Sequence, residues 1–227
     1  MARIAAPHNR TYFMSKQTLH TIEIELKKRW KYPYKWLQKQ NNKWDNYTNF
    51  IYTISNWNDL IQCIDEISEK NKIESNLLFN YAINRWYNFW SSVAVEQIFT
   101  QIDGIIVTKN PKDREVDFKL FGINFDHKTS VFPKHLKNDL AYAQANKRKL
   151  MEWFFRNQSS QRRHHLKNRL FIICYDENGA HWKLKAELEL IKFQIHKYVA
   201  SFSEEQLYSF TFAEGTKTYS DIIWVTK

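Results

Sequence analysis

The sequence predicts an α/β protein whose central sheet carries helices on its faces, preceded by a helical extension. Three stretches indicate this class. Residues 75–100 have the composition of a long helix that is apolar nearly all round, and residues 116–128 alternate apolar and polar side chains around Gly122, as the two strands of a hairpin do. Residues 170–175, L-F-I-I-C-Y, form a short apolar run that is typical of a buried central strand. Helix and strands follow one another with short connections, which favours an α/β layer arrangement.

The composition is that of a folded protein with a sizeable core. Of the 227 residues, 43% are hydrophobic and 16% aromatic, whereas only 4 are Gly and 4 Pro, which argues against a disordered or loop-rich chain. No apolar run approaches the ~18 residues of a transmembrane helix, and the first ten residues lack the apolar segment of a secretory signal. Cys63 and Cys174 have no CxxC spacing, which disfavours a zinc cluster. We therefore expect a cytoplasmic protein without a membrane partner.

The charge of the chain points to a polyanionic partner. A formal net charge of +10 and a pI near 9.4 suit nucleic acid, the commonest polyanion that basic proteins bind. Basic surfaces also serve solubility or acidic membranes, so these alternatives stay open.

Residues 1–72 read as a predominantly helical extension. Lysines and arginines interleave with Trp and Tyr between residues 27 and 44, Pro33 separates two helices, and residues 56–70 repeat apolar side chains at helical spacing. One interpretation is an arm that contacts nucleic acid through both kinds of side chain. The other is a small helical subdomain with an aromatic core and solvated cations. We favour the core for the aromatic residues and phosphate contacts for some of the lysines.

The predicted helix at residues 75–100 carries an acid on an apolar-rich side. Glu96 lies one turn after Ser92 and two turns after Phe89. A carboxylate in such a place has to be paired, neutral or bound to a metal. A bond to Arg85 or to backbone amides is the structural alternative.

A first strand is expected at residues 105–108, and a hairpin follows at 116–128. If Phe121 and Gly122 form a two-residue turn, Leu120 lies opposite Ile123, and the register of the whole hairpin follows from that pair.

This register places Asp117 opposite Asp126 and Glu115 opposite Lys128. Like charges that face each other on paired strands are destabilising. A divalent metal such as Mg²⁺ between the two aspartates would account for the arrangement, because hard cations bind carboxylate oxygens. The alternative is a solvated hairpin face on which Glu115 and Lys128 form an ion pair.

The second half of the chain continues the alternation of helices and strands. We expect a helix at 138–156, the buried strand at 170–175, a brief strand at 181–185, a helix at 186–202 and two strands at 207–212 and 219–225.

The segment between Leu140 and Tyr175 is strongly basic. Its only acid is Glu152, against eight Lys or Arg. We expect a patch that follows the phosphates of a nucleic acid. The alternative is a charged, mobile loop. The predicted contacts are Lys147, Arg148, Arg162, Arg163, Lys167 and Arg169.

The order of these features resembles the PD-(D/E)xK nuclease superfamily, which has the restriction-endonuclease-like fold. The resemblance covers about residues 75–175 and rests on an acid-bearing helix, on V-D-F at 116–118 and on F-D-H-K-T-S at 125–130. It implies a mixed central sheet flanked by helices. In that family a helix precedes the sheet, an Asp ends or begins the second strand, and the (D/E)-x-K motif lies on the third. Val116 replaces the Pro of the first half-motif.

The resemblance also implies roles for individual residues. Asp117 and Asp126 would bind Mg²⁺ together with the backbone carbonyl of His127, and Mn²⁺ would substitute. Glu96 would reach the same metal or a second one. Lys128 would orient the attacking water or stabilise developing negative charge.

The expected function is therefore a Mg²⁺-dependent endonuclease with its nuclease core at residues 73–227, acting on DNA rather than RNA. Restriction, mobile-element cleavage and repair or junction processing are all compatible with this expectation. A homodimer is compatible too, since one active site cuts one strand. The alternatives are a non-catalytic nucleic-acid-binding protein on a similar scaffold and a protein-interaction domain whose charge is solubilising.

Overall fold

The chain forms two compact units. The computed structural model describes residues 18–107, 116–157, 167–212, 215 and 217–227. The first unit comprises Met1–Ala94 with Ala186–Leu188, and the second comprises Val95–Lys185 with Glu189–Lys227. The division falls inside the long helix that the sequence predicts at 75–100, whereas we expected the boundary after residue 72. No described helix has the length and apolar character needed to cross a membrane.

The first unit is helical, as predicted. Side chains of Thr18, Asn41 and Asn56 cap the starts of three of its helices by accepting a backbone N–H, which explains where these helices begin. Its elements, with η for 3₁₀ helices, are α2 (Leu19–Lys27), η1 (Lys28–Lys31), α3 (Asn42–Tyr47), η2 (Asn49–Tyr52), α4 (Trp57–Asn71) and most of α5 (Ser75–Thr100).

Aromatic rings form the core of the first unit. Trp57 and Trp86 are buried and meet edge to face at 5.7 Å, and Trp44 packs on the buried Tyr81 at 5.5 Å. The interleaved aromatic residues of the extension thus pack internally, in agreement with the structural interpretation. Arg85 donates to Thr48 and to neighbouring groups of this unit, and so it is bonded here and not to Glu96.

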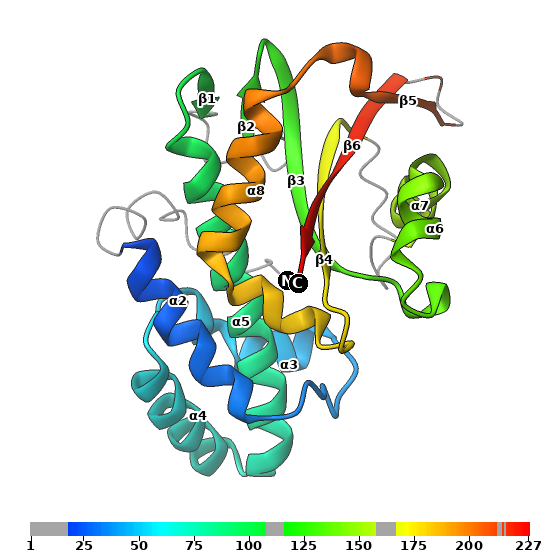
Figure 1. Cartoon of the computed structure of the whole chain (residues 1–227). Coiled ribbons are helices and arrows are strands. Elements are labelled where there is room, and N and C mark those ends of the chain that lie inside the picture. Colours follow the sequence, from blue (N-terminus) through cyan, green and yellow to red (C-terminus); the bar gives the residue numbers. More distant parts are fainter. Residues whose placement is uncertain (1–17, 108–115, 158–166, 213–214, 216) are drawn as a thin grey trace. The chain divides into compact units, whose positions relative to one another are not determined.

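The second unit is built on one six-stranded mixed sheet (Figure 1). The strand order is β1-β2-β3-β4-β6-β5, in which β3, β4 and β6 run parallel and the other neighbours are antiparallel. The α/β class predicted from the sequence is confirmed. The strands are β1 (Ile105–Val107), β2 (Phe118–Leu120), β3 (Ile123–Val131), β4 (Arg169–Tyr175), β5 (Tyr208–Thr211) and β6 (Lys217–Thr226).

Helices cover both faces of this sheet, and most lie where the sequence predicted them. In Figure 1, α6 and α7 lie on one side, and α8 lies on the other with the last turns of α5. The elements are η3 (Lys134–Leu136), α6 (Leu140–Ala145), α7 (Lys147–Arg156), η4 (His181–Ala186), α8 (Leu188–Ala200) and η5 (Glu204–Gln206).

Two predicted elements differ from the structure. The single helix expected at 138–156 is divided into α6 and α7 at Asn146, whose φ of −116° and ψ of 39° lie outside the helical region. The strand expected at 181–185 is wrong, because this segment is the 3₁₀ helix η4. Both edges of β4 are already paired, with β3 and β6, so β4 offers no free edge to a strand that follows it closely.

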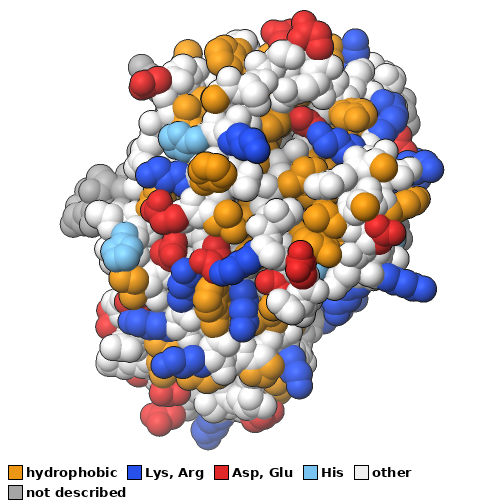
Figure 2. Space-filling model, viewed as in Figure 1, with side chains coloured by type: hydrophobic (Ala, Val, Ile, Leu, Met, Phe, Trp, Pro, Cys, Tyr) orange, Lys and Arg blue, Asp and Glu red, His pale blue; other side chains and the backbone are white. Residues whose placement is uncertain are grey.

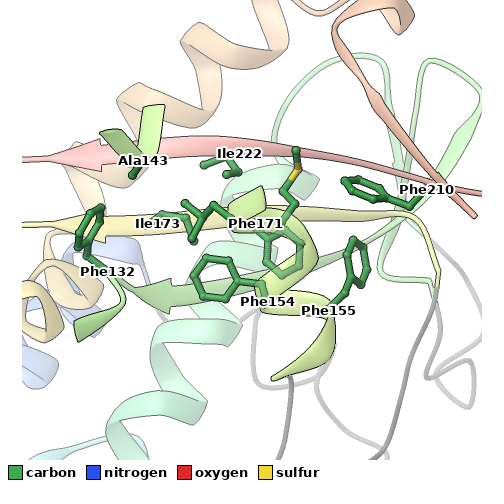
Figure 3. Close-up of a cluster of buried hydrophobic side chains, with 10 residues drawn as sticks. Phe132, Ala143, Phe154, Phe155, Phe171, Ile173, Phe210 and Ile222 are labelled. Atoms are coloured by element: carbon green, nitrogen blue, oxygen red, sulfur yellow. The ribbon is translucent and has the colours of Figure 1, made fainter. Parts of the chain in front are cut away.

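A phenylalanine-rich cluster fixes α7 on the sheet. Phe154 and Phe155 of α7 pack on Phe171 of β4 at 5.1 and 5.3 Å between ring centroids, and Phe210 of β5 lies against Phe155 (Figure 3). Since side chains alternate along β4, Arg169 lies on the same face as Phe171. This cluster therefore adjoins the polar groups at the start of β4.

The β2–β3 hairpin has the predicted register. Leu120 pairs with Ile123, and the two-residue turn between them has φ values of 45° at Phe121 and 87° at Gly122. Positive φ at both positions is the mark of a type I′ turn, whose twist matches that of the strands. The Phe121 ring, although largely exposed, stacks on Phe202 with a centroid distance of 5.6 Å and an interplanar angle of 4°.

Candidate active site

The predicted acids meet at the end of the β2–β3 ladder. Asp117 immediately precedes β2, while Asp126 and Lys128 lie on β3 and, being two residues apart, share one face of the sheet. The regular ladder ends at the pair of Phe118 with Phe125, and one further backbone bond follows, from the N–H of Asp117 to the carbonyl of Phe125 at 2.9 Å, so the two aspartates are not a ladder pair as predicted. Beyond that point the side chain of Asp117 replaces a backbone acceptor, because its carboxylate accepts the N–H of His127.

Asp117 is held from one side by a single residue. Its Oδ2 accepts the backbone N–H of His127 at 2.9 Å and lies 2.7 Å from the ring Nδ1 of the same residue. A carboxylate can only accept here, so Nδ1 carries the proton. Burial opposes ionisation of Asp117, but the charge and the hydrogen bonds of His127 outweigh it and hold the pKa of this carboxyl below its ordinary value.

Asp126 is held by Arg169, the residue beside it in the β3–β4 register. Its Oδ2 accepts Nε of Arg169 at 2.6 Å and also Nη2. Burial raises the pKa of Asp126 to about 6; Arg169 opposes this shift and the charge of Asp117 adds to it. The two carboxyl groups lie close enough that each shifts the pKa of the other.

Lys128 completes a charged group on this face. It meets solvent, yet protein atoms surround it closely enough that the loss of hydration lowers the pKa of its ammonium. The positive charges of Lys185 and Arg169 act in the same direction, and Asp126 opposes them. Sequence reasoning missed Lys185, because it was assigned to a strand that the structure does not contain.

The His127 side chain lies on the opposite, aromatic face of β3. Its ring is buried beside Phe99 of α5 and Phe118 of β2, with centroids at 6.0 and 6.4 Å, and these two phenylalanines stack on each other at 4.3 Å. Burial alone would lower the pKa of His127, but the negative charges of Asp117, Asp126 and Glu96 raise it. The sequence had suggested a role only for the backbone carbonyl of this residue.

Glu96 approaches His127 on that face. It is half-buried in the last turns of α5, and its negative charge near the imidazole contributes to the raised pKa of His127. Among the described residues there is no group of three or more His, Cys, Asp or Glu arranged to hold a metal ion. Metal ligation by Glu96 therefore stays a prediction.

Several predicted phosphate contacts have partners within the protein. Lys147 lies 3.1 Å from the buried Asp221, Arg148 lies over the Phe210 ring, and Arg169 is buried against Asp126. On the face drawn in Figure 2, basic and acidic side chains are interspersed and do not form one basic patch. Lys167 is exposed, whereas Arg162, Arg163 and Glu115 lie outside the described residues. Nucleic-acid contacts by this set stay a prediction.

The two aspartates fit a divalent cation of the Mg²⁺ type. Each is fixed through Oδ2 by two N–H donors, and no N–H of the described residues bonds Oδ1 of either. Two adjacent carboxylates match the one or two protein carboxylates with which Mg²⁺ is bound, the remaining ligands being water and substrate phosphate. Burial and the charge of Asp117 raise the pKa of Asp126 even beside Arg169, and a bound cation would favour its ionised form.

Comparisons of the chain with protein families, curated proteins and solved structures found no match.

Proposed function

We propose that the second unit hydrolyses phosphodiester bonds of nucleic acid, most readily DNA, with Mg²⁺ as cofactor. The observation that carries the proposal is the adjacency of Asp117 and Asp126, with Lys128 on the same strand face as Asp126. The order of elements supports it: α5 precedes the sheet, Asp117 precedes the second strand, and Asp126 and Lys128 lie on the third. This is the order expected of a restriction-endonuclease-like core.

The chemistry follows from the charges at this edge of the sheet. A bound divalent ion would neutralise charge on the scissile phosphate and acidify its own water. Asp117 and Asp126 would hold that ion, each oriented by its own pair of N–H donors. Lys128, whose pKa is lowered, would hold the attacking water or hydrogen-bond the phosphate oxygens as their charge grows.

Cleavage of supercoiled plasmid in Mg²⁺ or Mn²⁺ tests this proposal. Asp126→Ala and Lys128→Ala are each expected to lower the rate by about 100-fold or more. Lys197→Ala, an exposed lysine of α8, is the matched control and is expected to cleave like the wild type. Cleavage that survives in both site variants would contradict the assignment.

A non-catalytic nucleic-acid-binding protein is the second candidate function. Its supporting observation is that Arg169 already neutralises Asp126 without a metal. A gel shift that persists in both site variants, combined with intact plasmid at every metal concentration, would favour this candidate over the nuclease.

A further inference from the structure

The imidazole of His127 makes a contact that the proposed reaction does not use directly. The backbone N–H and the ring Nδ1 of this one residue converge on a single oxygen of Asp117, at 2.9 and 2.7 Å. His127 thus forms two hydrogen bonds to Asp117, one from its backbone N–H and one from its side chain. Rotation of the Asp117 carboxylate would break both bonds.

The surroundings of the ring fix its plane. The His127 side chain is 3% exposed, and it lies beside the stacked pair of Phe99 and Phe118. Its Nε2 is buried and hydrogen-bonds no described residue. The only described hydrogen bond of the ring is therefore the one to Asp117, and the aromatic pair limits where that bond can point.

A carboxylate that is fixed before the cation arrives has less freedom to lose on binding. Residues that hold metal ligands in this way typically change metal affinity by 10–100-fold when they are replaced. From the two hydrogen bonds to Asp117 and the packing of the ring beside Phe99 and Phe118, we infer that His127 is a positioning residue, whose ring Nδ1–H holds Asp117 in the orientation that binds the divalent cation. The inference rests on the proposed metal site.

Two substitutions separate positioning from packing. The side-chain nitrogen of Asn occupies nearly the place of Nδ1 in His, whereas that of Gln corresponds to Nε2. His127→Asn can therefore still donate to Asp117, although it leaves the larger void beside the stacked Phe99 and Phe118. His127→Gln fills more of the void but places its donor beyond Asp117. A packing role favours Gln, and a positioning role favours Asn.

Mn²⁺ binding to the full chain, measured by titration calorimetry, is the readout. His127→Gln is expected to weaken Mn²⁺ binding by about 10–100-fold, and His127→Asn to bind at least about tenfold more tightly than His127→Gln. Equal losses in the two folded variants, or no loss in either, would overturn the inference. Wild-type protein that binds no Mn²⁺ would overturn the metal site itself, and the inference with it.

A measurement on the wild type covers the case in which either variant fails to fold. Long-range ¹H–¹⁵N correlation spectra report which imidazole nitrogen carries a proton. In the metal-free protein we expect a protonated Nδ1 on His127 that stays protonated when Mg²⁺ is added. A bare Nδ1 in either state would overturn the inference, because the bond to Asp117 would then be absent.

Discussion

Arg169 lies against the candidate site as the cation of a buried ion pair, and replacing it by Gln tests whether that pair substitutes for a metal. The side chains of Arg169 and Asp126 are 7% and 20% exposed. Removing one partner of a buried pair costs about 3–5 kcal/mol of unfolding free energy, mainly because the other charge stays buried. We expect Arg169→Gln to lose about that much at pH 7 in the absence of metal.

The pH dependence of this loss follows from Asp126. Its pKa of about 6 in the folded protein lies above the ordinary 3.8, so its contribution to stability is fully present below about pH 4 and is lost as the pH rises through 6. Without Arg169 the pKa of Asp126 rises further, so at pH 5 the variant carries the proton and little unpaired charge stays buried. The loss caused by the substitution should therefore be smaller at pH 5 than at pH 7 by roughly 1–2 kcal/mol.

Mg²⁺ should reduce the difference between variant and wild type. In the variant the cation no longer competes with the guanidinium for Asp126, and tenfold tighter binding corresponds to about 1.4 kcal/mol of recovered stability. Urea unfolding of wild type and variant at pH 5 and pH 7, with and without Mg²⁺, measures the loss of unfolding free energy under each of the four conditions. Arg156→Gln, an exposed arginine at the end of α7, is the control and should change stability by less than about 0.5 kcal/mol. A loss that is independent of both pH and Mg²⁺ would refute the reasoning.

Three further outcomes are expected. Mg²⁺ affinity should fall about tenfold per pH unit below pH 6, because Asp126 has to release its proton to bind the ion; calorimetry that finds a constant affinity from pH 4.5 to 7 would contradict this. In a Phe202→Ala background, in which the stack of Phe121 on Phe202 is already absent, Phe121→Asn should stabilise the protein by about 1 kcal/mol, because Asn adopts the positive φ of this turn position with less strain than Phe. A loss of stability in thermal unfolding would argue against that explanation. Phe171→Ala should cost about 3–5 kcal/mol in urea unfolding, and a cost below 1 kcal/mol would mean that the cluster under α7 does not support the sheet.

Local pattern predicted the hairpin well. Alternation of apolar and polar residues fixes which side chains share a face, and a two-residue turn at Phe121 and Gly122 fixes the register, so the pairing of Leu120 with Ile123 followed from the sequence alone. The same reasoning placed Asp126 and Lys128 on one face. These features depend on residues fewer than ten positions apart.

Features that depend on distant residues were not predictable in this way. The register of β4 beside β3 joins residues 43 positions apart, and it alone places Arg169 on Asp126. The basic composition of the segment before β4 suggested a phosphate contact for Arg169, whereas burial requires this charge to be paired inside the protein. Likewise, the alternation in residues 181–185 fits a strand, but β4 had no free edge to receive one.

The hydrogen bonds that hold Asp117 and those that hold Asp126 depend on different parts of the fold. Asp117 is held by His127, ten positions away on the same hairpin, so this half can form when the hairpin forms. Asp126 is held by Arg169, whose position requires the parallel pairing of β3 with β4 and thus the folded sheet. A pair of fixed carboxylates exists only when both conditions are met. A cation that needs both would therefore bind the folded unit and not its unfolded chain, which is the condition under which a ligand stabilises a fold.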